Sequence, residues 1–264
     1  MDIKIEFKGL KELIANMDNL AKTQLPFATA KALTKTAGDV KRNEIQQMST
    51  KLDRPTPYVI NSLYVKPATK QNLVSEVGFK DYAGGGTNKR GANIIYPHVE
   101  AGKRHLKGFE SALQRIGVLP KGMYIAPGAA CPLDAYGNIP SGLIVKIMSY
   151  FRAFGEQGYK ANITDERKAK LKRGTKKKTG FEYVVIKPNE GWGTGQHLAP
   201  GIYMRQNVPI GRGRIRPIMM FVKIPSYRKR FPFYETAQKI VDIKFKMNFD
   251  EAMREALLTM KRTG

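Results

Sequence analysis

The 264-residue sequence predicts an α+β fold, with a mostly antiparallel sheet flanked by helices and with long basic and glycine-rich loop insertions. Two patterns predict it: short runs with an apolar residue at every second position, and longer runs with apolar residues three or four apart. Hydrophobic residues make up 42% of the chain, which is enough to build a core. We expect a single α+β domain over 1–264, with a basic arm or loop at 160–180 inserted within it.

The N-terminal part predicts a strand followed by two helices. Apolar residues at positions 3, 5 and 7 alternate with charged ones, which is typical of a short, half-buried strand. Helical spacing over 10–23 predicts a first helix. Pro26 is expected to open a second helix, because proline is tolerated in the first turn. This second helix should end before Pro55.

The middle of the chain predicts a β-hairpin, a loop and a helix. Strands are expected at 63–65 and 73–79, joined by a short turn. The glycine-rich stretch at 84–91 is expected to be a loop. A helix is expected at 98–116, where Gly117 is well placed to end it. The stretch from Pro120 to Pro140 is dense in turn residues.

The C-terminal half predicts a short apolar helix at 143–154, three strands and a closing helix. The strands are expected at 181–187, 201–206 and 217–224. After Pro232 the apolar residues step by three or four, which predicts one helix, or two helices broken near 248–250.

The charge balance indicates a polyanionic partner. The chain has 46 Lys+Arg against 22 Asp+Glu, a net charge of +24. A surface that repels itself to this degree is normally neutralised by a partner, and nucleic acid is the first candidate. An anionic membrane is the second, but neither a clear amphipathic basic helix nor a lipidation signal is present, so we expect no membrane partner. Without a signal-peptide pattern, we expect the protein to be made and assembled in a cytoplasm.

The sequence offers no candidate for catalytic chemistry. The glycines at 191–195 match neither the dinucleotide nor the Walker pattern. His98 and Glu100 resemble the start of a zinc-deaminase signature, but the two further thiolates are missing, since Cys131 is the one cysteine. Carboxylates show no paired spacing for acid–base work. We expect no enzyme activity, no catalytic residue, no metal and no cofactor.

Two basic segments supply the candidate interface. Nine basic residues fall between Lys160 and Lys178, and such a block should repel itself and form a mobile arm or loop. No acidic residue occurs over 191–234, where the arginines at 212, 214 and 216 alternate and would share one side of an extended strand. The candidate DNA-binding residues are Lys168, Lys170, Lys172, Arg173, Lys176, Lys177, Lys178, Arg212, Arg214, Arg216, Arg228, Lys229 and Arg230. Guanidinium forks suit phosphate oxygens.

Two other interpretations of these segments stay open: a solvated face, or contact with acidic neighbouring subunits. No helix-turn-helix, zinc-finger or RRM consensus occurs, so contact with DNA is expected to be with the backbone. Backbone contact suits a channel or collar, whereas a repressor needs base edges.

Several segments together resemble a known family. These are the alanine- and threonine-rich helix at 28–37, Tyr96 to Gly102 with the following 103–110, Gly122 to Gly128, Arg216 to Phe221, and a terminal helix. On these segments the chain resembles the tail completion proteins of tailed phages, of the lambda-type minor tail protein Z group. The basic segment at 160–178 and the glycine-rich loop at 84–91 look like additions to that pattern.

The resemblance implies a non-enzymatic virion component at the phage neck or tail, which completes the tail or joins it to the head. Its partners would be other copies of itself in a ring around the DNA path, other neck and tail proteins, and the backbone of the genomic DNA. Closed rings are the usual outcome of heterologous contacts that complete a rotation. Two rivals remain: a free-standing, sequence-nonspecific nucleic-acid-binding or ribosome-associated protein, and a nuclease or other DNA enzyme.

Overall fold

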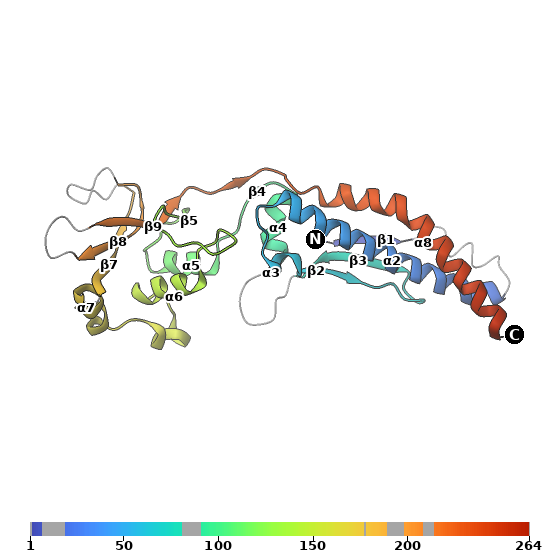
Figure 1. The fold of residues 1–264 in the computed structure, drawn as a ribbon, viewed down its shortest axis with the longest axis horizontal. Helices are drawn as coiled ribbons and strands as arrows, with labels where there is room; N and C mark the ends of the chain where they lie inside the picture. Colours follow the sequence, from blue (N-terminus) through green and yellow to red (C-terminus); the bar gives the residue numbers. More distant parts are fainter. Residues whose placement is uncertain are drawn as a thin grey trace. The chain divides into compact units, whose positions relative to one another are not determined.

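The computed structural model describes residues 2–6, 19–80, 91–176, 178–188, 198–207 and 214–263. The contacts divide the chain into two compact units (Figure 1). The first unit contains 1–102 and 227–264, and the second contains 103–226. Each hydrophobic cluster of the described residues belongs to one unit only, and the single domain over 1–264 stays a prediction. Helices and antiparallel sheets confirm the α+β class. The glycine-rich loop at 84–90 lies outside the described residues.

The sheet of the first unit has three antiparallel strands in the order β1-β3-β2. They are β1 (Asp2–Glu6), β2 (Leu63–Lys66) and β3 (Val74–Phe79), and Val77 of β3 lies opposite both Ile3 and Val65. The predicted N-terminal strand and hairpin are thus confirmed. The one-turn helix α3 (Pro57–Ile60), whose N-cap is Thr56, precedes β2.

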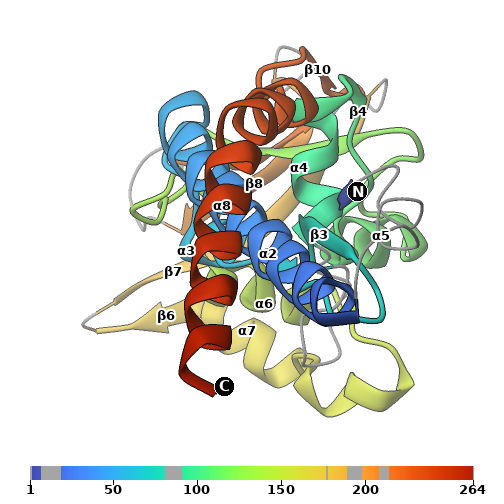
Figure 2. The same cartoon turned by 90° about the vertical axis from the view of Figure 1, so that its right-hand side faces the viewer.

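Two long helices, α2 (Asn19–Lys51) and α8 (Phe233–Thr263), pack side by side in the first unit (Figure 2). Asn248 of α8 donates to Thr36 of α2, and towards the other ends of the helices Thr236 reaches Glu44, so the pair is antiparallel. Four buried alanines allow close packing: Ala28, Ala32, Ala252 and Ala256.

The prediction that Pro26 opens a helix needs correction, and the alternative of one unbroken closing helix is confirmed. Pro26 lies inside α2 and does not open a new helix. Burial of Leu25 and Ala28 on either side of Pro26 offsets the hydrogen bond that proline cannot donate. The closing helix α8 is unbroken through 248–250, because Asn248 is buried and hydrogen-bonded to α2.

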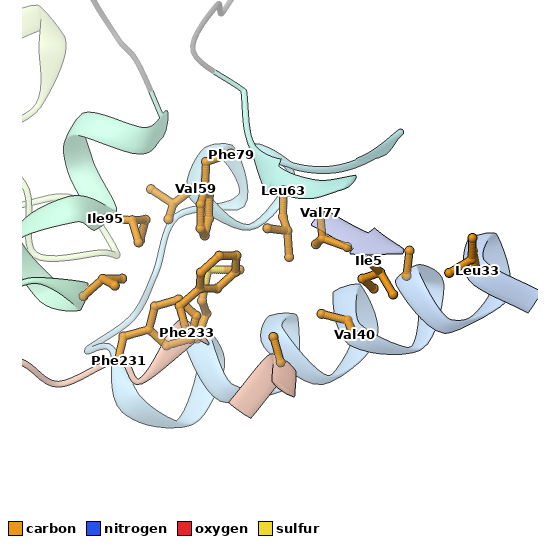
Figure 3. Packing of buried hydrophobic residues seen from close by; sticks show 14 residues of the cluster. Ile5, Leu33, Val40, Val59, Leu63, Val77, Phe79, Ile95, Phe231 and Phe233 are labelled. Carbon is orange, nitrogen blue, oxygen red and sulfur yellow. The ribbon is translucent and has the colours of Figure 1, made fainter. Parts of the chain in front are cut away.

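The core of the first unit lies between the sheet, α2 and the start of α8 (Figure 3). Leu33 and Val40 of α2 belong to the same buried cluster as Val77 of β3, and the rings of Phe79 and Phe233 lie 5.3 Å apart. Burying side chains of this size contributes roughly 1.5–3 kcal/mol each. This core fixes α2 and the first turns of α8 on the sheet.

The prediction of one continuous helix over 98–116 is wrong, because two separate helices cover parts of this stretch. Helix α4 (Gly91–Val99) ends one residue after His98, and α5 (Gly108–Arg115) starts nine residues later. Ala101 and Gly102 have positive φ angles of 61° and 112°, which a continuous helix does not allow. The two-residue strands β4 (Gly102–Lys103) and β10 (Ser226–Tyr227) pair with each other where the chain passes between the units.

The second unit contains a five-stranded antiparallel sheet in the order β5-β9-β8-β7-β6. Its strands are β5 (Tyr124–Pro127), β6 (Gly174–Thr175), β7 (Lys178–Ile186), β8 (Gly201–Asn207) and β9 (Ile215–Val222). The last three confirm the predicted strands, whereas β5 lies in the stretch expected to contain only turns. Helices α5 and α6 (Ser141–Tyr150) contribute Leu113 and Ile147 to the core beside Met219.

The basic segment at 160–178 has regular structure in its described residues, contrary to the mobile arm or loop that the sequence predicts. A 3-10 turn, η1 (Glu156–Ala161), leads into helix α7 (Asp165–Arg173), and β6 and β7 then form a hairpin. Caps at both helix ends and contacts with the sheet offset the repulsion between the lysines.

Candidate nucleic-acid interface

Helix α7 forms because its two ends are stabilised although its charges repel. The Thr164 side chain caps the N-terminus by accepting from the backbone N–H of Arg167, and the first turn contains Asp165 and Glu166. The last turn carries Lys170, Lys172 and Arg173 beside the negative end of the helix dipole. Gly174 then ends the helix with a φ of 76°. The charges therefore follow the polarity of the helix.

Three side-chain contacts hold α7 on the body of the second unit. The Arg152 guanidinium lies 2.5 Å from the Asp165 carboxylate. The Lys168 ammonium lies over the Tyr150 ring, 4.4 Å from its centroid. The Lys172 ammonium lies 3.1 Å from Oε2 of Glu182 on β7. Two of the predicted DNA-binding lysines, Lys168 and Lys172, thus have partners inside the unit.

Glu182 is the acidic group to which two cations attach. Arg205 on β8 donates to its Oε1 at 2.5 Å, while Lys172 binds its Oε2. Partial burial favours the neutral acid, but the hydrogen bonds from Arg205 and Lys172 hold the pKa of Glu182 below its ordinary value. Lys172 and Arg205 are therefore neutralised locally.

Of the predicted DNA-binding residues, four exposed cations remain on α7 and the β6–β7 hairpin. Lys170 and Arg173 lie on the exposed side of α7, and Lys176 and Lys178 lie at and beside the hairpin turn. None of the four has an acidic ion-pair partner among the residues that the structure describes. We call Lys170, Arg173, Lys176 and Lys178 the α7 basic surface.

Arg214 and Arg216 lie on the other side of the sheet from Lys178. Arg216 pairs with Met204 and Met204 with Tyr183, so these three residues share one face. Glu182 is adjacent to Tyr183 and points the opposite way, as Lys178 does by the two-residue alternation of β7. The two exposed arginines do share one side, as their spacing predicts, since Gln206 N–H donates to the Arg214 carbonyl and continues the ladder.

The remaining predicted residues are not placed with the α7 basic surface. Arg228, Lys229 and Arg230 belong to the first unit. There Lys229 forms an ion pair with Glu235, and the Arg230 backbone N–H donates to the His98 carbonyl. Lys177 and Arg212 lie outside the described residues, as do the glycines at 191–195.

One buried ion pair in the second unit was not predicted from the sequence. Arg104 donates to both oxygens of Glu110 at 2.7 and 2.6 Å, and Glu110 also accepts from the backbone N–H groups of Lys107 and Ile125. Burial favours neutral Glu110, but these hydrogen bonds lower the pKa of its carboxyl. The pair ties α5 to β5, and its six-residue spacing gives no helical signal by which to find it.

The other candidate groups do not form a reactive site in the described part of the chain. His98 is partly buried, which together with Arg230 lowers the pKa of its imidazole. Burial raises the pKa of the Cys131 thiol, which favours its unreactive form. A hollow of about 560 Å³ between α2 and α8 is lined by three basic and three acidic side chains, so its charges balance.

The described residues contain neither a cluster of metal-ligating side chains nor a membrane-spanning helix. These residues contain no cluster of three or more His, Cys, Asp or Glu side chains arranged to hold a metal ion. None of their helices has the length and apolarity needed to cross a bilayer.

Comparisons with protein-family models, with curated proteins and with solved structures find no match to this chain.

Proposed function

We propose that this protein is a structural component of a phage particle, at the neck or tail, that contacts the backbone of DNA through the α7 basic surface. Copies arranged in a ring around the DNA path would multiply this surface. The particle and the ring rest on the family resemblance. The DNA contact rests on one observation: four exposed cations without acidic partners among the described residues, on a helix and hairpin that are themselves anchored.

The distribution of charge supports a partner for the second unit in particular. Residues 103–226 contain 22 Lys+Arg against 7 Asp+Glu, a net charge of +15. The first unit contains 24 Lys+Arg against 15 Asp+Glu, a net charge of +9. Cations on a rigid helix lose little conformational freedom when they bind phosphates, and each neutralised phosphate releases counterions.

The proposal is tested with the double variant Lys176→Glu/Lys178→Glu. We expect a weaker affinity for double-stranded DNA of unrelated sequences. The salt slope should fall in magnitude by about 2, since each phosphate that a lysine no longer neutralises reduces it by about 1. The measurement is fluorescence anisotropy of labelled duplexes over a series of NaCl concentrations.

The matched control is Lys121→Glu/Lys146→Glu, which lowers the net charge equally at two exposed lysines elsewhere in the second unit. If both double variants lose the same affinity, the effect comes from net charge and the α7 basic surface is not the contact. Cryo-electron microscopy of the particle tests the location. A chain that binds DNA but is never found in particles would be a free-standing nucleic-acid-binding protein.

A further inference from the structure

A row of exposed residues runs along α8 in the first unit, and three of them, Met247, Asp250 and Arg254, also line the hollow between α2 and α8. Ile243, Met247 and Leu257 are 61, 59 and 51% exposed, although side chains of this kind normally lie in a core. With the exposed Asp250 and Arg254 they occupy positions 243, 247, 250, 254 and 257. Alternating steps of four and three place all five on one seam, as in a coiled coil. We call these five residues the α8 seam.

The opposite side of α8 is already occupied by α2. Asn248, Ala252 and Ala256 are buried there, and the Asn248 amide donates to Thr36 and to Asp39. Because α8 cannot turn without breaking these contacts, the α8 seam stays exposed in a single copy of the unit.

The charges of the α8 seam are complementary to those of a second α8 seam that runs antiparallel to it. About a midpoint at residue 252, Met247 lies opposite Leu257, and Asp250 opposite Arg254. A parallel pair would instead place Asp250 against Asp250 and Arg254 against Arg254. Neither Asp250 nor Arg254 forms an ion pair with another described residue of its own chain, although Arg254 lies near Glu251 and helps to lower the pKa of that carboxyl.

We propose that the α8 seam binds the α8 seam of a second copy of this chain in antiparallel orientation. The contact buries Met247 against Leu257 of the other copy, extends to Ile243, and closes with two equivalent Asp250–Arg254 ion pairs. Such a contact is isologous and joins two copies only, so any contact that closes a ring lies elsewhere. This dimer does not depend on the proposed function.

The first experiment uses the single variants Asp250→Arg and Arg254→Asp of the full chain, measured by sedimentation equilibrium. Each creates two like-charge contacts in the pair, and we expect the dimer dissociation constant to rise at least about tenfold. The double variant Asp250→Arg/Arg254→Asp exchanges the charges and should restore dimerisation. Equimolar Asp250→Arg and Arg254→Asp chains should form a mixed dimer, because arginines then face aspartates at both contacts.

A second variant tests the orientation through cross-linking in a Cys131→Ser background. In an antiparallel pair residue 247 of one copy lies opposite residue 257 of the other. The two copies of residue 247 are then ten residues apart along the helix axis, which is about 15 Å at a rise of 1.5 Å per residue. A Met247→Cys chain should therefore form a disulfide only when mixed with a Leu257→Cys chain. Disulfides within either chain population alone would indicate a parallel pair and overturn the proposal.

Controls separate this contact from folding and from DNA binding. Val145→Glu removes another half-exposed apolar side chain, on α6 of the second unit, and should leave the dimer unchanged. Circular dichroism should show wild-type helix content in all variants, since Asp250 and Arg254 are exposed. A wild-type chain that remains monomeric at all concentrations, or single variants with an unchanged dissociation constant, would overturn the proposal whatever the DNA affinity.

Discussion

Glu44 shows how one side chain makes the first unit sensitive to pH. The residue is fully buried between α2 and α8, where its Oε1 accepts from the Thr236 hydroxyl at 2.7 Å and its Oε2 has no hydrogen-bond partner among the described residues. Burial raises the pKa of this carboxyl from 4.5 to about 7, and the hydrogen bonds from Thr236 and Asn43 offset only part of that rise. Below about pH 7 the helix pair therefore contains an acid that is mostly protonated.

The raised pKa of Glu44 predicts a loss of stability as pH rises. Between about 4.5 and 7 the folded chain binds more protons at this position than the unfolded chain, so the free energy of unfolding falls with pH. Glu44→Gln removes this titration. At pH 8 we expect the variant to be more stable than wild type by up to about 3 kcal/mol, with little difference at pH 4.

Urea denaturation followed by circular dichroism at several pH values measures this effect. Asp242→Asn, a change at an exposed acid on α8, serves as the control and should keep the wild-type pH slope. A Glu44→Gln slope equal to that of wild type would contradict the assignment.

At the scale of elements, the contact between α7 and β7 depends on a glycine. A Cβ at Gly180 would clash with the Lys172 carbonyl oxygen and lie 2.7 Å from the Arg173 carbonyl carbon. Only a residue without a side chain lets the end of α7 pack this closely on β7. The absence of a side chain at Gly180 therefore lets α7 lie close against β7, and the ion pair between Lys172 and Glu182 holds it there.

Gly180→Ala is expected to separate α7 from β7 while leaving the first unit folded. We expect faster proteolysis at the lysines of α7, detected by mass spectrometry after limited trypsin digestion, and weaker DNA binding because the cations are no longer held in place. Gly142→Ala, at an α6 position where a Cβ would meet no atom within 4 Å, should behave as wild type. Equal protection of α7 in both variants would show that the close approach is dispensable.

At the scale of the whole molecule, the two proposed contacts should differ in their salt dependence. DNA binding through the four cations of the α7 basic surface should give a slope of about −4 in a plot of log K against log [NaCl], at about −0.9 per phosphate. Two associating copies, each with a net charge of +24, repel each other. Because salt screens this repulsion, the dimer should not weaken as the salt concentration rises.

This difference is measured on the wild-type chain by titrating NaCl in parallel anisotropy and sedimentation experiments. We expect a salt range in which DNA is released and the dimer persists. Dissociation of DNA and dimer at the same salt concentration, with the same slope, would indicate that the dimer is held by DNA and not by the α8 seam.

Local patterns along the chain were sufficient for part of the fold. The alternation at Ile3 and Ile5, the hairpin at 63–79 and the strands near 181, 201 and 217 follow from neighbouring residues, so residue type and spacing predict them. The sequence also contains a signal for the start of a helix, Thr164 followed by Asp165 and Glu166. The many lysines that follow it led instead to the prediction of a mobile arm or loop. The net charge was likewise readable, because it depends on composition alone.

Contacts between residues far apart in the sequence decided the rest. Lys168 and Lys172 do not differ from Lys170 in sequence, yet Tyr150 and Glu182 bind the first two and leave the third exposed. The continuity of α2 through Pro26, the buried pair of Arg104 and Glu110 and the separate cores of the two units arise in the same way. Burial is a property of the neighbours that folding supplies, so which charges face solvent became known only with the tertiary structure.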